Sequence, residues 1–178
     1  VLIDELFQLP ALMTDALKVD EVVKEIARKL TSCRSMIVLG RNILYPIAME
    51  GALKVKELSY IHAEGYPAGE LKHGPIALIE ENVPVIVLLH EDVELEKTIS
   101  NLEEVHARGG HIIAIGSESS LDQVSVQGVS KISVPACSRL QAAFVLTLPL
   151  QLLAYHIATL KGTDVDQPRN LAKSVTVE

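Results

Sequence analysis

The hydrophobic positions of this chain follow two patterns, short continuous runs and a helical spacing. Continuous apolar runs cover residues 35–39, 83–89 and 111–115, and a glycine or a polar residue follows each of them. Runs of this length, bounded by turn residues, predict strands that are buried on both faces. Weaker runs at residues 60–64 and 131–134 predict two further strands.

Between the strands, apolar residues recur at helical spacing. Residues 20–33 and 94–108 carry apolar positions on one face and charges on the other, which predicts two amphipathic helices. Residues 140–160 are apolar on nearly all sides, so this stretch is expected to be the longest helix and to be buried or to form an interface. Residues 1–17 predict a lead-in helix that is interrupted at Pro10.

The alternation of strands and helices predicts an α/β fold. We expect a three-layer α/β/α sandwich around a roughly five-stranded parallel sheet. Residues 1–17 would form a lead-in or linker helix, and residues 18–162 a single domain. Residues 163–178 are polar, contain Pro168 and show no sustained period, which indicates a functional tail.

Composition supports this architecture and excludes several classes of function. Of the 178 residues, 48% are hydrophobic and only 3% are aromatic, as expected for a parallel sheet covered by helices. A net charge of −7 without a basic stripe argues against nucleic-acid binding. No uninterrupted apolar run reaches the roughly 20 residues that span a bilayer, so we expect a cytoplasmic protein without membrane contact. Two isolated cysteines fit a reducing compartment.

The first group of candidate catalytic residues lies in the segment 50–57. Glu50, Lys54 and Glu57 are spaced by four and three residues, so a helix places them on one face. Ligands of parallel sheets sit at the carboxyl ends of the strands, and these side chains could reach that crevice if the helix packs beside it. Glu57 is then a candidate general base that Lys54 keeps ionised. The alternative is an ordinary surface ion pair.

The second candidate is His73, which precedes Gly74-Pro75 in a segment that cannot be regular helix or strand throughout. Imidazole titrates near neutral pH and could pass a proton to or from a substrate oxygen. Most loop histidines have no such role. No pair of histidines has the spacing of metal ligands with a supporting acid, so neither a metal nor a cofactor is expected.

The third candidate is Lys173, which lies between apolar residues in the tail. A lysine that folds onto a pocket can lose its proton through desolvation and attack a carbonyl as an imine-forming amine. An exposed tail lysine without a function is the commoner case. None of the three groups is decisive by itself.

Two longer motifs change this picture. The segment EGALKVKELSYIHAEGYPAGELKHGP at residues 50–75 and the closing DQPRNLAKSVTVE at residues 166–178 resemble the C-terminal end of the glutamine–fructose-6-phosphate aminotransferase (isomerizing) family, the glucosamine-6-phosphate synthases. The similarity extends through essentially the whole chain, and the tail resembles bacterial members in particular.

The resemblance implies an architecture that is larger than this chain. Members of the family have an N-terminal glutaminase domain followed by two sugar isomerase (SIS) domains, and residues 18–162 resemble the second SIS domain, with 163–178 as the catalytic tail. The family's phosphate-gripping Ser/Thr loop belongs to the first SIS domain, and the loop at residues 40–45 here, GRNILY, has no serine or threonine. The resemblance therefore implies a homodimeric enzyme of which the isolated fragment is inactive.

The resemblance also implies a reaction and a set of roles. The family converts fructose 6-phosphate and glutamine-derived ammonia to glucosamine 6-phosphate for amino-sugar and cell-wall precursor synthesis. Glu57 matches the glutamate that moves a proton between C1 and C2, and Lys54 matches the lysine that assists it. His73 matches the histidine that opens the sugar ring across the dimer interface. Lys173 matches the lysine that forms an imine with the open-chain ketose, and the backbone at Ala172 would line the sugar site.

Two other classes of function remain as alternatives. A stand-alone SIS sugar-phosphate isomerase would need a phosphate-gripping serine loop and would not explain the tail. A non-catalytic SIS module that senses sugar phosphates would carry an attached DNA-binding domain and would not need the set of Glu57, His73 and Lys173.

Overall fold

The structure is a computed structural model that describes residues 2–91 and 94–171. Its centre is a five-stranded sheet in the order β2-β1-β3-β4-β5, and every neighbouring pair of strands is parallel. The strands are β1 (Ser35–Gly40), β2 (His62–Pro67), β3 (Pro84–Leu88), β4 (His111–Gly116) and β5 (Ser130–Ser133). The predicted parallel α/β architecture is confirmed.

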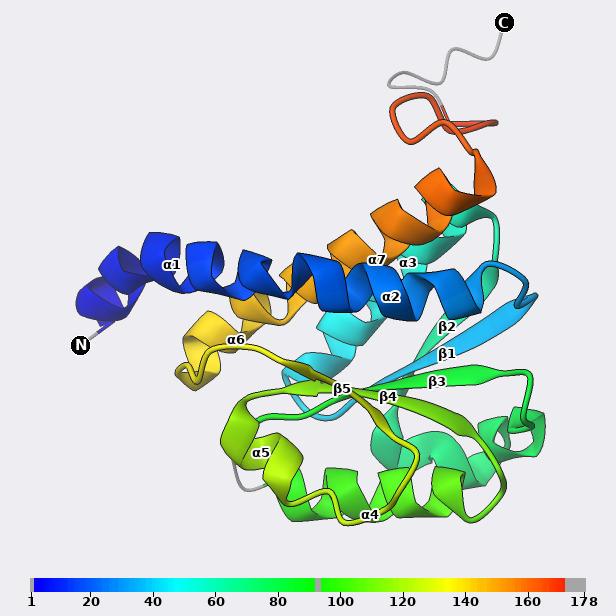
Figure 1. The fold of residues 1–178 in the computed structure, drawn as a ribbon. Coiled ribbons are helices and arrows are strands. Elements are labelled where there is room, and N and C mark those ends of the chain that lie inside the picture. The colour runs from blue at the N-terminus through cyan, green and yellow to red at the C-terminus, as the bar shows by residue number, and fades with distance from the viewer. Residues whose placement is uncertain (1, 92–93, 172–178) are drawn as a thin grey trace, which may run out of the picture.

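Helices cover both faces of this sheet (Figure 1). One face packs against α2 (Asp20–Leu30), α3 (Leu44–Ser59) and α7 (Thr147–Lys161). The other face packs against the 3-10 helix η2 (Ala68–His73), α4 (Leu95–His106) and α5 (Glu118–Asp122). The remaining helices are α1 (Leu2–Ala16), η1 (Leu17–Val19), η3 (Pro75–Leu78) and α6 (Arg139–Val145).

The two apolar cores explain why the strands have continuous apolar sequences. In β1, Met36 and Val38 belong to the core on the α3 side, whereas Ile37 and Leu39 belong to the core on the α4 side. Successive strand residues point to opposite faces, so a sheet covered on both sides needs an apolar residue at every position.

Helix α3 packs against the edge strand β2 at very short range. A Cβ atom at Gly65 would lie 2.7 Å from the Cα of Met49, a distance that real Cβ atoms do not tolerate. The absence of a side chain at Gly65 therefore lets the backbone of α3 approach β2 directly. This contact sets the height of α3, and of its charged face, above the sheet.

Three sequence predictions about helices are wrong: that Pro10 interrupts the first helix, that residues 140–160 form one helix, and that this helix is the longest. Helix α1 is continuous through Pro10, because Pro10 is exposed and solvent can hydrogen-bond the carbonyl group that Pro10 leaves without a helical partner. The stretch predicted at 140–160 divides at Leu146 into α6 and α7, so α3, with 16 residues, is longer than either. The start of α6 is fixed by a capping box between Ser138 and Gln141.

The strand predicted at 60–64 begins later, at His62, and continues to Pro67. The reason is Tyr60, which adopts the left-handed conformation with φ of 60° and ends α3. A left-handed residue cannot join a strand, so pairing with β1 starts two residues later.

One stretch of the described residues is long and apolar enough to cross a membrane by length and mean composition alone, although polar residues interrupt it. Residues Arg139–Lys161 meet that criterion over 23 residues, with half of the apolar window buried inside the protein. Leu153, Ala154 and Ile157 on this stretch are fully buried in the core shared by α2, α3 and the sheet. The buried side chains explain its apolar character as that of a core element.

Candidate active site

The charged face predicted on α3 is present in the structure. The Nζ atom of Lys54 lies 2.7 Å from Oε2 of Glu57 and 3.5 Å from Oε1 of Glu50. Lys54 and Glu57 are partly buried, with 30% and 27% of their side chains exposed, and Glu50 is more open. The hydrogen bond to Glu57 and the charge of both carboxylates raise the pKa of Lys54, against the opposing effect of burial. The lysine is therefore held in its charged form.

Glu57 does not reach the crevice at the carboxyl ends of the strands. Helix α3 starts just after the carboxyl end of β1 and runs back against the strand direction, so its last turn lies beside the start of β2 at His62. Glu57 is in that last turn and thus lies at the opposite end of the sheet, where the strands begin. The expectation that the charged face reaches the carboxyl-end crevice is wrong for this chain.

His73 lies in a different layer from Glu57. It ends η2, whose Ala68 and Leu71 are buried in the core on the α4 side of the sheet. Its ring Nδ1 is 2.7 Å from Oε2 of Glu70, and 72% of its side chain is exposed. The sheet therefore separates His73 from Glu57 within one chain, and the structure does not bring these two candidates together.

An ion pair that the sequence analysis missed lies at the carboxyl ends of β1 and β3. Nε of Arg41 donates to Oε2 of Glu94 at 2.6 Å, and its NH1 group donates to Oδ1 of Asn101 at 3.1 Å. Both charged side chains are about three-quarters buried, since 25% and 21% of their surfaces are exposed. The hydrogen bond from Arg41 lowers the pKa of Glu94. Arg41 follows β1 directly, so its place after a buried strand was the available signal.

A second carboxylate at the carboxyl ends of the strands is held by hydrogen bonds within the protein. Glu91 accepts hydrogen bonds from the hydroxyl groups of Ser117 and Ser119. Burial raises the pKa of Glu91, but these hydrogen bonds outweigh it and the net pKa is lowered. A hollow of about 670 Å³ lies beside this group, lined by Ser117, Ser119 and Ser133 among others, and neither Glu57 nor His73 lines it.

The segment after α7 returns to the end of α3, close to Glu57. The hydroxyl group of Thr163 donates to the carbonyl oxygen of Leu58 at 2.7 Å. The backbone N–H of Arg169 donates to the hydroxyl oxygen of Tyr60 at 2.9 Å, although 109 residues separate the two. Sequence spacing could not reveal this contact. Ala172 and Lys173, the remaining predicted site residues, lie outside the described residues.

Within residues 2–91 and 94–171, no group of three or more histidine, cysteine or acidic side chains is arranged to hold a metal ion.

The parallel sheet and its covering helices match a known domain class. The model of the SIS domain family matches residues 29–161, which is most of the chain. This protein belongs to the SIS domain family.

The individual relatives are more specific. The chain is 53% identical over 177 residues to glutamine–fructose-6-phosphate aminotransferase (isomerizing) from Mesorhizobium japonicum, and 52% identical over 176 residues to that from Bartonella quintana. Each alignment covers 99% of this chain but only 29% of the relative. The C-terminal domain of glucosamine-fructose-6-phosphate aminotransferase from Francisella tularensis superposes with a TM-score of 0.90 at 48% identity, covering 92% of this chain and 46% of that one. The resemblance found in the sequence is confirmed, and the chain spans about three-tenths of the length of the curated relatives.

Proposed function

We propose that this chain is the C-terminal half of the isomerase part of a glucosamine-6-phosphate synthase, a glutamine–fructose-6-phosphate aminotransferase. The observation that carries the proposal is the convergence of two segments at one end of α3. The partly buried pair of Lys54 and Glu57 lies in the last turns of that helix, and Tyr60 and Leu58 hold the tail at the same end. Lys173 follows Arg169 by four positions, a distance of at most roughly 13–14 Å along an extended chain.

The chemistry of these groups fits amination followed by ketose-to-aldose conversion. The amine of Lys173 attacks the C2 carbonyl of open-chain fructose 6-phosphate, and water leaves as the imine forms. Ammonia then displaces the lysine and leaves the sugar as the C2 imine. Glu57 removes a proton from C1 of the protonated C2 imine to give an enaminol. It then returns a proton to C2 while the C1 hydroxyl group loses its proton, which gives the 2-amino aldose. Lys54, 2.7 Å from Glu57, assists it, and the backbone of Ala172 lines the sugar site.

His73 is proposed to serve the site of the other subunit in a homodimer. Two observations support this assignment. The side chain is largely exposed, and the sheet separates it from Glu57 of its own chain. A two-fold dimer can bring such an exposed residue to the charged face of the partner subunit, where it would open the sugar ring by proton transfer.

The remaining parts of the enzyme are proposed to come from the same longer polypeptide, as a glutaminase domain and a first SIS domain. Arg41 is paired with Glu94, and the loop at residues 40–45 has no serine or threonine, so the grip on the sugar phosphate is assigned to the first SIS domain. Helix α1 presents Leu2, Ile3 and Phe7 to solvent, a surface suited to packing against such a neighbour. We accordingly expect the isolated fragment to be inactive and the whole enzyme to be cytoplasmic.

The proposal is tested by trapping the imine in the full-length protein. Incubation with fructose 6-phosphate and borohydride should fix a hexose phosphate on Lys173, which peptide mass spectrometry would locate. A Lys173→Arg variant, which keeps the charge but cannot form the imine, should give no adduct. An adduct on another lysine, or no adduct during turnover, would contradict the proposal. A stand-alone sugar-phosphate isomerase, the alternative function, would interconvert ketose and aldose without incorporating ammonia.

A further inference from the structure

The strongest feature outside the charged face is the contact between Tyr60 and Arg169. Besides the hydrogen bond from the Arg169 N–H to the Tyr60 hydroxyl oxygen, the guanidinium carbon of Arg169 lies 4.1 Å from the centroid of the Tyr60 ring. The ring thus receives a cation–π contact while its hydroxyl group binds the backbone. Two different parts of Arg169 contact two different parts of Tyr60. We call this pair of contacts the Tyr60–Arg169 clasp.

The backbone conformation of Tyr60 is specific to this arrangement. Tyr60 has φ of 60°, and its N–H closes the last turn of α3 by donating to the carbonyl oxygen of Lys56 at 3.2 Å. Residues with a Cβ atom adopt this region rarely, and where they do the surrounding contacts must hold them there. Helix α3 therefore ends so that the Tyr60 ring leaves the helix axis and faces the returning tail.

The tail approaches Tyr60 through a series of ordered turns. Gly162 ends α7 in the left-handed region, and the Thr163 side chain then binds the end of α3. The carboxylate of Asp164 accepts hydrogen bonds from the backbone N–H groups of Asp166 and Gln167, both at 2.9 Å. Figure 1 shows this segment, in orange and red, continuing beyond the end of α7. The polar sequence of residues 163–171 thus encodes a defined path, which its lack of periodicity did not indicate.

The position of the clasp relates it to the chemistry. Tyr60 comes three residues after Glu57, and Arg169 comes four residues before Lys173. A contact between Tyr60 and Arg169 thus ties the segment with the proposed nucleophile to the helix end with the proposed base. Because misplacement of a reacting group by about 1 Å can slow a reaction by about 100-fold, such a tether matters for rate.

We propose that Tyr60 and Arg169 are positioning residues that hold the tail so that Lys173 meets the sugar next to Glu57. This inference rests on the proposed function and adds two residues to it. Neither side chain is expected to touch the reacting atoms. Their contribution should appear in the rate of imine formation, with the affinity for the sugar phosphate largely unchanged.

The first experiment tests the clasp without any reference to catalysis. Hydrogen exchange of the Arg169 amide is measured in the full-length protein and in its Tyr60→Phe variant, which keeps the ring and removes the acceptor. The amide should be protected in the unmodified protein and exchange at least about tenfold faster in the variant. If the Arg169 amide of the unmodified protein exchanged as fast as in an unstructured peptide, the clasp would not form. This conclusion would hold independently of the enzyme's activity.

The second experiment tests the positioning role. Tyr60→Ala and Arg169→Ala should each lower kcat and the rate of borohydride trapping on Lys173 by about 10- to 100-fold, with KM for fructose 6-phosphate within about twofold. The kcat of Tyr60→Phe should fall by less, because this variant keeps the ring that Arg169 covers. The double variant should be no slower than Tyr60→Ala alone, because both changes remove the same contact. Tyr45→Phe on the same helix and Arg28→Ala on α2 serve as controls and should behave as the unmodified enzyme.

The outcomes separate this inference from the proposed function. Failure of the unmodified enzyme to form an adduct on Lys173 would overturn both. Normal trapping in Tyr60→Ala would overturn the positioning role alone and leave the proposed function intact, as would effects of the two single variants that simply add. A rise in KM with unchanged kcat would assign the pair to substrate binding and equally contradict the inference.

Discussion

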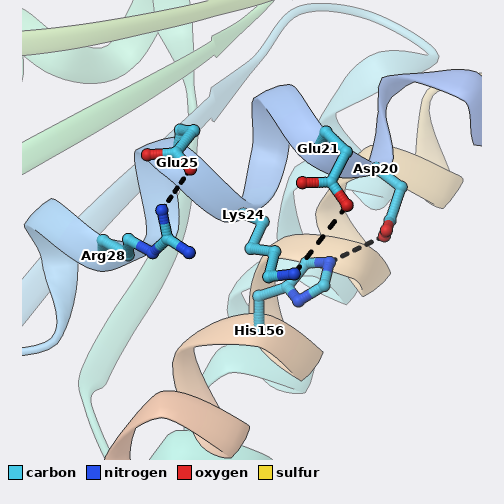
Figure 2. Close-up of polar contacts among 6 residues, drawn as sticks. All are labelled: Asp20, Glu21, Lys24, Glu25, Arg28 and His156. Carbon is cyan, nitrogen blue, oxygen red and sulfur yellow. Dashed lines mark hydrogen bonds and ion pairs between the residues drawn. The ribbon is translucent and has the colours of Figure 1, made fainter.

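The ring Nε2 atom of His156 lies 2.7 Å from Oδ1 of Asp20, and this contact joins α7 to the first turn of α2 (Figure 2). Only 10% of the His156 side chain is exposed, whereas Asp20 is open to solvent on one side. The contact satisfies a nearly buried imidazole at the point where two core helices cross. The ion pairs within α2, by contrast, have side chains that are much more exposed than that of His156.

Replacing Asp20 by alanine should destabilise the fold, because it leaves the buried His156 without this partner. Loss of one partner of a buried polar contact costs about 1–3 kcal/mol in the free energy of unfolding. Figure 2 also shows the matched control, the exposed pair of Glu25 and Arg28 one helical turn further along α2. Glu25→Ala should cost less than about 1 kcal/mol. Urea unfolding of the two variants would measure both values, and equal losses would contradict the prediction.

Gly65→Ala should be markedly destabilising, because its Cβ atom would meet the backbone of α3 at Met49 at 2.7 Å. Backbone atoms of a packed helix cannot rotate away, so α3 must move, at a cost of about 1–3 kcal/mol. Gly51→Ala is the informative comparison. There the new atom meets the tip of the Leu150 side chain, which can adjust, and alanine gains about 1 kcal/mol in helix propensity. Thermal melting should rank Gly65→Ala well below Gly51→Ala, and the reverse order would refute this account of the contact.

Glu57→Gln in the full-length enzyme should lower kcat by at least about 100-fold, because the amide cannot accept the C1 proton. Glu50→Gln removes the outer, more exposed carboxylate that also contacts Lys54 and should change kcat by less than about threefold. Steady-state assay of glucosamine 6-phosphate formation distinguishes the two. A Glu57→Gln enzyme with near-normal turnover would move the base to another residue.

The placement of His73 and Glu57 on opposite sides of the sheet predicts complementation between inactive subunits. Full-length Glu57→Gln and His73→Asn dimers should each be inactive alone. After mixing and subunit exchange, each heterodimer carries one site with both native residues, so activity should return to roughly a quarter of the unmodified level. Continued inactivity of the mixture, with heterodimers verified by mass spectrometry, would mean that both residues serve the same subunit.

The ion pair of Arg41 and Glu94 should make stability depend on acid pH. Because Arg41 lowers the pKa of Glu94 below its ordinary value of 4.5, the pair contributes stability above pH 4.5 that is lost as the pH falls through the lower folded-state pKa. Arg41→Gln should therefore be less stable at pH 7, and its deficit should shrink in strong acid. Lys97→Gln removes a longer, 3.6 Å contact with the same carboxylate and should have a smaller effect. A deficit for Arg41→Gln that is the same at pH 7 and at pH 3 in urea unfolding would contradict this assignment.

The sequence predicted the parts of the fold that follow from local periodicity. Continuous apolar runs identified the buried strands, and the spacing of Glu50, Lys54 and Glu57 identified a shared helix face. The break at Leu146 and the late start of β2 were missed. Pro149, in the first turn of α7, has no backbone N–H to continue the preceding helix, and the left-handed Tyr60 delays β2. Such local backbone choices override hydrophobic periodicity.

The candidate site was less predictable, because its contacts join distant parts of the chain. The contact between Tyr60 and Arg169 spans 109 residues and that between Arg41 and Asn101 spans 60, so no spacing rule could pair them. The direction of α3 relative to the strands likewise determined at which end of the sheet Glu57 lies. Only the motifs at residues 50–75 and 166–178 indicated that these segments act together.

The ion pair of Arg41 and Glu94 after β1 bears on inhibitor discovery. In most folds of this topology, a screen would be directed at the carboxyl ends of the strands, where natural ligands bind. Beside β1 and β3, Arg41 is bound to Glu94 and to the side-chain amide of Asn101, so a compound binding there would first have to displace these contacts. Chemical probes are better aimed at the hollow of about 670 Å³ at the same end of the sheet, which Ser117, Ser119 and Ser133 help to line.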